Sequence, residues 1–215
     1  MSNTAQDAKN SAPSEAYADR LLDAMLETAA EQGWTSLALD RAAKAAGLTS
    51  GEVKLAAPHG VASVLDRLGD RAAKAAEARL ALPDVDAMKV RDKVAAGVRA
   101  YLIHLEPHKA AMKRAAGSPW NMFAGPSALW RAADAVWAGL GDASTDHNWY
   151  TKRITLSAVL GSTLLAWLGS DDHAEIDRFL GHRIDDVMEF EKSKKKVQEA
   201  FAGLPDLFGL GDRKG

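Results

Sequence analysis

Residues 33–60 decide the fold, and they read GWTSLALDRAAKAAGLTSGEVKLAAPHG. Apolar residues recur every three or four positions on both sides of Gly47, which indicates two short helices, 35–46 and 49–57, joined by a glycine turn. The proline and the last glycine of the stretch end the second helix. Two short helices around a glycine turn are typical of a helix-turn-helix.

The helical pattern continues outward from this motif in both directions. Alanine is abundant, and no stretch alternates β-branched and polar residues as a strand would. We therefore expect an all-α chain of nine or ten helices, ended by residues such as Gly33, Pro83 and Pro107. Ser127 is expected near the N-cap of one helix, and Asp146 near the positive end of the next. The expected helices span 15–32, 35–46, 49–57, 61–80, 86–106, 109–116, 127–140, 144–168, 174–190 and 192–202.

The composition excludes several kinds of site. The chain has 215 residues, with 27 basic against 29 acidic residues, a formal net charge of -2 and no cysteine. Without cysteine there is no disulfide, no thiolate nucleophile and no cysteine-based zinc or iron–sulfur centre. The charge balance gives no overall attraction to nucleic acid or to an anionic membrane, so binding of either needs a local patch.

The sequence indicates neither a targeting peptide nor a membrane span. Residues 1–14 are polar and contain Lys9 but no arginine and no apolar core, so they read as a disordered tail. The longest uncharged run, 154–170, has 17 residues. A membrane-spanning helix needs ~20.

Catalytic and metal-binding patterns are absent from the sequence. His104 and His108 have the spacing of two metal ligands on one helix face, but Pro107 interrupts the helix that they would need. No Glu-x-x-His pair, Gly-x-Ser-x-Gly elbow, phosphate loop or dinucleotide fingerprint occurs. Asp172 is interpreted as a helix cap in a solvated loop. We therefore expect no catalytic residue, no metal and no cofactor.

The helix-turn-helix raises the hypothesis of DNA binding. The arrangement resembles the tetracycline-repressor family in layout, but Lys54 and Leu55 replace the aromatic pair that this family usually carries after the turn. The second helix offers one lysine and one glutamate, and residues 34–79 carry seven basic against five acidic side chains. Binding driven by phosphate contacts would be weak.

The tryptophans suggest an apolar pocket in the second half of the chain. Trp130 and Trp137 are seven residues apart and so share one helix face, where they either fill the core or border a cavity between helices. Ala158, Gly161 and Ser162 allow close helix packing, either within the chain or across a dimer. The residues predicted to line the pocket are Trp120, Phe123, Trp130, Trp137, Leu156 and Leu160.

The C-terminal segment is basic and amphipathic. Phe190, Val197, Phe201, Leu204 and Phe208 follow one another at helical spacings, and four lysines cluster among them. Such a segment either lies at a membrane surface or packs back on its own domain. The residues predicted to meet the membrane are Lys194, Lys195, Lys196, Val197, Phe201, Leu204, Leu207 and Phe208.

Residues 144–153, STDHNWYTKR, resemble a family hallmark. The family is that of the ubiquinone biosynthesis accessory proteins called coenzyme Q biosynthesis protein nine, in which a Ser-Thr-Asp-x-Asn-Trp-Tyr-Thr-basic-Arg segment recurs. The resemblance covers roughly residues 15–190. Shorter matching stretches are residues 33–35, 47–48, 136–137, 141–142, 178–180 and 183–188.

The resemblance implies a repressor-like all-α fold that binds lipid instead of DNA. Proteins of this family are not enzymes: they form dimers, hold isoprenoid lipids in an apolar pocket, meet the membrane through a C-terminal amphipathic helix and present a lipid intermediate to a di-iron hydroxylase. The family's partner-contact residues correspond to Val136, Trp149 and Tyr150 here. This chain departs from the pattern at His147, where an aromatic residue is common, and in a shorter tail after Glu199.

We therefore expect a non-catalytic isoprenoid-binding protein of ubiquinone biosynthesis. It is expected to be a homodimer that binds a quinone-precursor lipid, a membrane surface and a pathway hydroxylase, but no nucleic acid, at the cytoplasmic face of a bacterial inner membrane. The alternative is a tetracycline-repressor-like transcription regulator that binds DNA and a hydrophobic effector. The four expected segments are a disordered tail, the helix-turn-helix unit, a lipid-binding and dimerisation bundle, and the membrane-binding tail, at 1–14, 15–80, 81–190 and 191–215.

Overall fold

The computed structural model describes residues 13–117, 125–142 and 147–202, the last twelve of them as backbone only. All regular structure in these residues is helical, which confirms the all-α prediction, and the number of helices agrees with the expectation. The elements are α2 (Pro13–Gln32), α3 (Ser36–Ala45), α4 (Ser50–Ala56), α5 (Val61–Leu80), α6 (Pro83–Asp86), α7 (Val90–Leu105), the 3-10 turn η1 (Glu106–His108), α8 (Lys109–Ala116), α9 (Gly125–Gly139), α10 (His147–Gly169) and α11 (His173–Ala202).

The two short helices expected around Gly47 are α3 and α4, and both pack against α2. The side chain of Thr35 caps α3 by accepting a hydrogen bond from the Ala38 N–H at 3.1 Å. Thr49 and Glu52 form a capping box at the start of α4. Gly47 lies in the left-handed region with φ 64°, a conformation that favours glycine. Local sequence therefore fixes both helix starts and the turn between them.

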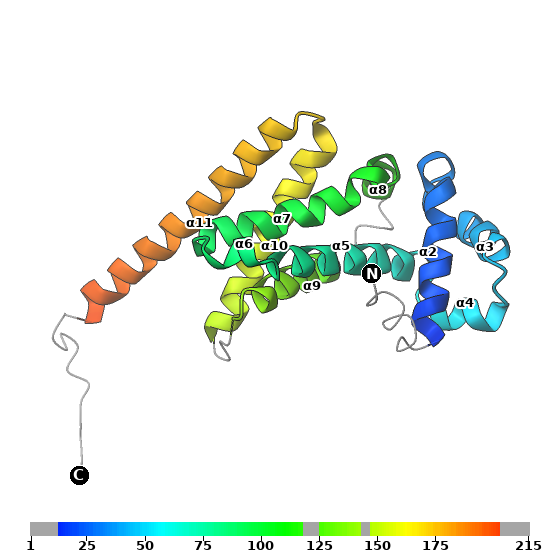
Figure 1. Ribbon diagram of the computed structural model, residues 1–215, viewed down its shortest axis with the longest axis horizontal. Helices are drawn as coiled ribbons and strands as arrows, with labels where there is room; N and C mark the ends of the chain where they lie inside the picture. Colours follow the sequence, from blue (N-terminus) through cyan, green and yellow to red (C-terminus); the bar gives the residue numbers. More distant parts are fainter. Residues whose placement is uncertain (1–12, 118–124, 143–146, 203–215) are drawn as a thin grey trace, which may run out of the picture.

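Helix α5 is the element around which the others pack, and it runs from the α2–α4 unit into the bundle (Figure 1). Its inward face carries Leu68, Ala72 and Ala76, all fully or almost fully buried. Small residues also bring α7 close to its neighbours, because a Cβ atom on Gly97 would lie 3.2 Å from Val136 of α9. The high alanine content thus serves close helix packing.

Polar links, among them an ion-pair cluster and a buried indole hydrogen bond, join the N-terminal helices to the rest of the chain. Asp19 of α2 accepts hydrogen bonds from Arg67 and Arg71 of α5, with the closest contacts at 2.6 and 2.9 Å. Burial alone would raise the pKa of the Asp19 carboxyl, but the two guanidinium groups bring it below its usual value. The indole N–H of Trp34 donates to the Ala111 carbonyl of α8 at 2.8 Å.

Several expected helix ends are corrected by the structure. Helix α2 already begins at Pro13, inside the segment expected to be a disordered tail, because proline is well tolerated in the first turn of a helix. Helix α9 begins at Gly125, so Ser127 lies within its first turn instead of at its cap. Helix α7 begins only at Val90, after the separate short helix α6. The predicted role of Asp146 lies outside the described residues.

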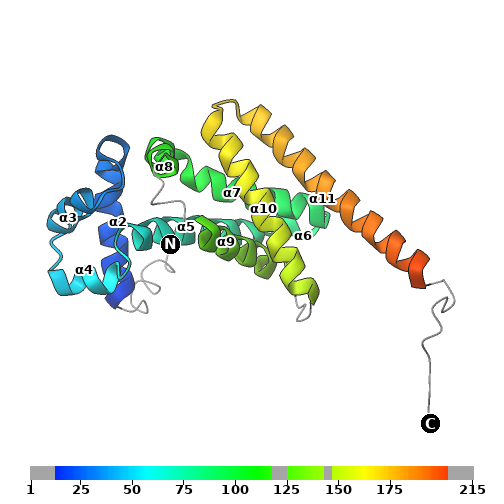
Figure 2. The same cartoon turned by 180° about the vertical axis from the view of Figure 1, so that it is seen from behind.

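The C-terminal helix also differs from the prediction. Two helices were expected at 174–190 and 192–202, whereas α11 is one continuous helix from His173 to Ala202. Its first half packs against α7 and α10, and its second half extends away from the bundle (Figures 1 and 2). Neither glycine nor proline stands between the two expected segments, so the charge cluster there does not break the helix.

The small residues of α10 serve packing within the chain at one position. A Cβ atom on Gly161 would lie 3.1 Å from a methyl group of Leu129 in α9. Ser162 donates its hydroxyl to the Val159 carbonyl of its own helix at 3.0 Å. Ala158, by contrast, is exposed. Of the two explanations that the sequence left open, intrachain packing therefore accounts for Gly161.

Candidate functional site

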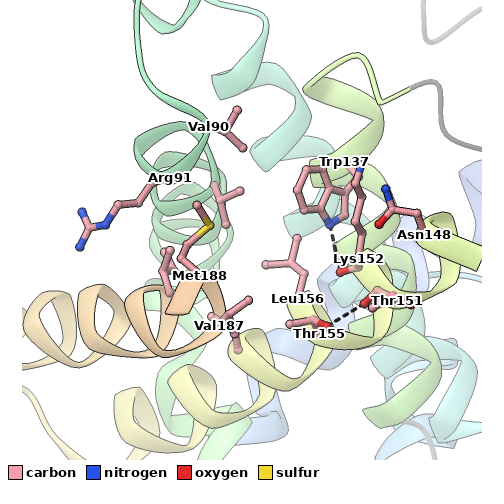
Figure 3. A pocket seen from close by; sticks show the side chains of 13 residues that line it. Val90, Arg91, Trp137, Asn148, Thr151, Lys152, Thr155, Leu156, Val187 and Met188 are labelled. Atoms are coloured by element: carbon pink, nitrogen blue, oxygen red, sulfur yellow. Dashed lines mark hydrogen bonds between the residues drawn. The ribbon is translucent and has the colours of Figure 1, made fainter. Parts of the chain in front are cut away.

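An apolar cavity of about 200 Å³ lies between α7, α9, α10 and α11 (Figure 3). Trp137, near the end of α9, forms one wall. Polar groups of α10 border the cavity through Asn148, Thr151, Lys152 and Thr155. The aliphatic side chains that complete the lining are Val90, Val94, Leu156, Val159, Ile184, Val187 and Met188.

A turn after α9 positions the polar side of this cavity. The Gly141 N–H donates to the Ala138 carbonyl at 2.9 Å, and the Asp142 N–H donates to the Trp137 carbonyl at 3.1 Å. This pair of bonds, with Gly141 at φ 72°, is a Schellman motif. The turn directs Asp142 toward α10, where its carboxylate accepts a hydrogen bond from the Lys152 ammonium at 2.6 Å.

Lys152 and Trp137 hold each other at the cavity wall. The Trp137 indole N–H donates to the Lys152 backbone carbonyl at 3.1 Å. The Lys152 ammonium lies 5.1 Å from the Trp137 ring centroid, within the range of a cation–π interaction. One turn further along α10, the Thr155 hydroxyl donates to the Thr151 carbonyl at 2.7 Å. These contacts keep the cavity side of α10 in one arrangement.

The second cation at the cavity, Arg91 of α7, belongs to a surface ion pair. Its Nε and Nη2 donate to the two carboxylate oxygens of Asp185 in α11 at 2.6 and 2.7 Å. The hydrogen bond that Arg91 donates to Asp185 is the main reason that the pKa of Arg91 is raised. Figure 3 shows the guanidinium pointing away from Trp137 and Lys152. The pair therefore joins two cavity walls from the outside.

An aromatic cluster reaches the surface beside the first turn of α10. Trp130, Trp149 and Tyr150 form it, with ring centroids 5.7 Å apart for the two tryptophans and 4.7 Å apart for Trp149 and Tyr150. Tyr150 is 58% exposed. A large exposed ring that packs against two neighbouring rings suits a protein–protein contact, because little conformational entropy is lost on binding.

Arg153 fixes this aromatic cluster from below. It is only 3% exposed, and its guanidinium carbon lies 3.9 Å from the Trp149 ring centroid. Its nitrogens reach Asp134 at 2.5 Å, Asp142 at 3.3 Å and the Trp149 carbonyl at 3.2 Å. Asp142 therefore holds Lys152 at the cavity and Arg153 under the aromatic cluster at the same time.

A second cavity of about 330 Å³ lies at the other end of α10, bordered also by α5, α7, α8 and α9. Leu65, Met112, Leu164 and Leu168 give it an apolar lining. Tyr101 also borders it, and burial raises the pKa of this phenol to about 12. The predicted pocket residues do not line this second cavity as far as they are described.

The predicted pocket residues are only partly brought together. Trp137 and Leu156 line the smaller cavity, whereas Trp130 belongs to the aromatic cluster. Leu160 is 1% exposed and lies in the core, on the part of α10 between the two cavities. Trp120 and Phe123 lie outside the described residues.

The predicted partner-contact residues separate into one buried and two accessible side chains. Val136 is 0% exposed and packs near Gly97, so it supports the surface and offers no contact of its own. Trp149 and Tyr150 reach the surface as a pair. Among the residues predicted to meet the membrane, those of 194–201 lie in α11, but their side chains are outside the described part of the structure. Leu204, Leu207 and Phe208 lie outside the described residues altogether.

The cavity residues from α7 and α11 were not predicted. Val94, Ile184, Val187 and Met188 lie on amphipathic helices whose apolar faces are visible in the sequence. Their positions on these apolar faces predict that they are buried. Only the packing of α7 against α11 brings them together at one cavity. No short-range pattern could have assigned them to this site.

The histidines that were weighed as metal ligands do not form such a site. Helix α7 ends at Leu105 and gives way to the turn that contains Pro107, as expected. Burial lowers the pKa of both His104 and His108. Within the described parts of the chain, no group of three or more His, Cys, Asp or Glu side chains could hold a metal ion.

No helix in residues 13–117, 125–142 or 147–202 combines the length and the apolar character that a membrane crossing needs.

Known proteins confirm the resemblance that the sequence suggested. The COQ9 family model matches residues 122–191. The ubiquinone biosynthesis protein COQ9, mitochondrial, of Homo sapiens is 28% identical over 218 residues, which cover 91% of this chain and 68% of the relative. The protein of the same name from Rattus norvegicus is 28% identical, with 91% and 70% covered. That of Drosophila melanogaster is 26% identical, with 96% and 69% covered.

Arg153 is expected to be essential for stability. Arg153→Met removes one partner of the Asp142 carboxylate, whose side chain is only 7% exposed, so we expect a loss of about 3 kcal/mol in the free energy of unfolding, measured by urea denaturation. The matched control is Arg99→Met, which breaks a surface ion pair to Asp177 and should cost less than about 1 kcal/mol. Equal losses in the two variants would contradict the role given to Arg153.

Proposed function

We propose that this chain, a homologue of the ubiquinone biosynthesis protein COQ9, is a non-catalytic lipid-binding protein of ubiquinone biosynthesis. It takes an isoprenoid quinone precursor from a membrane, holds it in the cavity beside Trp137 and presents it to a hydroxylase of the pathway. The names of the relatives support the pathway. The lipid, the membrane and the hydroxylase are supported by the geometry described above and by the resemblance in sequence.

One observation carries the proposal: a single helix, α11, borders the cavity and also continues as the basic amphipathic segment. Ile184, Val187 and Met188 line the cavity from its first half. The lysines of 192–196 follow on the same unbroken helix. When this segment lies on an anionic membrane, the cavity is held close to the lipid, because both belong to one continuous helix.

The size and lining of the cavity fit part of an isoprenoid quinone precursor. Sites that enclose a drug-sized molecule measure about 300 to 1,000 Å³. A cavity of about 200 Å³ therefore holds the ring and the first part of the chain, while the rest of a long tail extends outside. Branched aliphatic side chains from three helices pack well against the methyl branches of such a chain.

The aromatic cluster is the surface that we assign to the hydroxylase. Asn148 and Lys152 border the cavity. Trp149 and Tyr150 lie between them in the sequence, in the same part of α10. A partner that docks on the cluster is thus placed beside the polar end of the cavity. The chain's own residues bind and orient the lipid, and the oxidation is left to the partner.

The remaining parts of the proposal concern assembly and location. We assign a homodimer to this chain, as the resemblance implies, with the exposed Ala158 available for close contact. We place the protein peripherally at the cytoplasmic face of a bacterial inner membrane, whereas the relatives named above are mitochondrial.

The first test concerns the cavity. Met188 is 41% exposed at its rim, so Met188→Trp fills space without disturbing the core. We expect this variant to bind ubiquinone-2, a quinone with two isoprene units, at least about tenfold more weakly in titrations followed by fluorescence quenching. The matched control, Phe190→Trp, changes an exposed residue of the same helix that does not line the cavity, and should bind as the unchanged chain does. Equal binding by all three proteins would place the lipid elsewhere.

The second test concerns the membrane. A chain ending after Ser193 should keep its helical circular dichroism but no longer sediment with anionic phospholipid vesicles, because the lysines and the apolar residues that follow are removed. A full-length variant with Lys194, Lys195 and Lys196 changed to Gln should bind these vesicles more weakly and respond less to salt. Undiminished sedimentation of the shortened chain would exclude the segment as the membrane contact.

The third test concerns the partner surface. Tyr150→Ala removes an exposed ring and leaves the core intact, so we expect unchanged stability but binding to the pathway hydroxylase about tenfold weaker or more. Ile103→Ala, a truncation of another exposed apolar residue, on α7, is the control and should bind the hydroxylase normally. The assignment is wrong if the two variants behave alike in surface plasmon resonance.

A further inference from the structure

The charged residues that border the cavity beside Trp137 are two cations, and each has a carboxylate partner. Arg91 and Lys152 are the charged side chains in its lining. The other polar side chains in the lining are neutral, namely Asn148, Thr151, Thr155 and the indole of Trp137. The character of the cavity toward a ligand therefore depends on whether these two positive charges are available.

The charge of Lys152 is neutralised by a buried carboxylate. Its ammonium lies 2.6 Å from Asp142, whose side chain is only 7% exposed. The other oxygen of Asp142 faces Arg153 at 3.3 Å, and Arg153 has a second carboxylate, Asp134, at 2.5 Å. Two cations and two carboxylates are thus linked in one group. Taking Lys152 out of this group to meet a ligand would leave a buried carboxylate with one partner fewer.

The charge of Arg91 is neutralised outside the cavity. Its guanidinium makes a two-pronged contact with Asp185 at 2.6 and 2.7 Å, and Asp92 lies 3.5 Å away. The guanidinium points away from Trp137 and Lys152 (Figure 3). Two-pronged pairs of this kind are the strongest ion pairs that a protein surface offers. An anion in the cavity would have to displace Asp185 from Arg91.

From this pairing we infer that the cavity selects lipids with an uncharged ring or head over lipids that carry a carboxylate or a phosphate. The inference rests on the proposed function and names the class of its ligand. An anion that enters loses its hydration and finds no cation without a carboxylate at hydrogen-bonding distance. A quinone, a phenol or an alcohol loses much less, and its ring or chain packs against the Trp137 indole.

The test compares two probes with the same isoprenoid chain, farnesol and farnesyl diphosphate. Binding to the full-length chain and to Met188→Trp is measured by isothermal titration calorimetry. The part of the binding that Met188→Trp loses is assigned to the cavity. Any binding of the diphosphate to the lysines of 192–196 remains in this variant and is thereby separated. We expect the cavity to bind farnesol at least about tenfold more tightly than farnesyl diphosphate, because one missing charge-assisted hydrogen bond is enough for that ratio.

Two variants convert the expectation into a gain of binding. Asp185→Asn leaves Arg91 without its two-pronged partner on an exposed surface. It should raise the affinity for farnesyl diphosphate about tenfold and leave that for farnesol unchanged. Asp142→Asn removes the carboxylate that the Lys152 ammonium contacts, so it should lower the preference for farnesol over the diphosphate. Asp134→Asn removes the other carboxylate of Arg153 without touching a cavity cation, so it is the matched control and should change neither affinity.

The outcomes separate the inference from the proposed function. If the cavity binds neither probe, both the lipid-binding function and the inference are wrong. If the unchanged chain binds the two probes equally well, or prefers the diphosphate, the function stands and the inference is overturned. The inference also fails if Asp185→Asn, which keeps the fold because Asp185 lies on the surface, leaves the affinity for the diphosphate as it was.

Discussion

The pairing of Asp142 with Lys152 and Arg153 is the constraint on which the functional half of the molecule depends. A carboxylate that is 7% exposed has to be paired, and here two of its partners are consecutive residues on α10. Consecutive helical residues point in directions about 100° apart. One partner therefore faces the cavity and the other lies under the aromatic cluster. The Schellman turn at Gly141 puts the carboxylate between them, so the end of α9, the start of α10 and both surfaces are fixed together.

Local rules account for most of the helices but not for the site. Glycine and proline marked the turn at Gly47 and the break at Pro107, because their backbone limits act within a few residues. The seven-residue spacing of Trp130 and Trp137 correctly placed both on one side of α9. It could not show that the two tryptophans contact different residues of α10. Trp137 contacts Lys152 at the cavity, whereas Trp130 contacts Trp149 in the aromatic cluster. Such separation is decided by the packing of one helix on another, which no spacing within a helix contains.

The continuity of α11 changes how membrane and cavity are related. Two separate helices would have let the basic segment move independently of the domain. An unbroken helix from His173 to Ala202 instead carries the orientation of the membrane contact directly to Ile184 and Met188 at the cavity. The ion pair between Arg91 and Asp185 then ties this helix to α7 at the level of the cavity. The opening of the cavity thus has a fixed direction relative to the segment that we assign to the membrane.

The basic segment and the cavity have opposite preferences for charge, and a lipid carrier needs both. In the function that we propose, the lysines attract the protein to anionic membranes, where phosphate-bearing lipids are the most abundant molecules within reach. If Lys152 and Arg91 were unpaired, these lipids would compete with the cargo for the cavity and would hold it by strong charge-assisted hydrogen bonds. Pairing each cation with a carboxylate removes that attraction while the aliphatic lining continues to favour an apolar chain. Selectivity for a neutral isoprenoid then comes from a cost imposed on its competitors, because one well-placed carboxylate per cation is enough to exclude them.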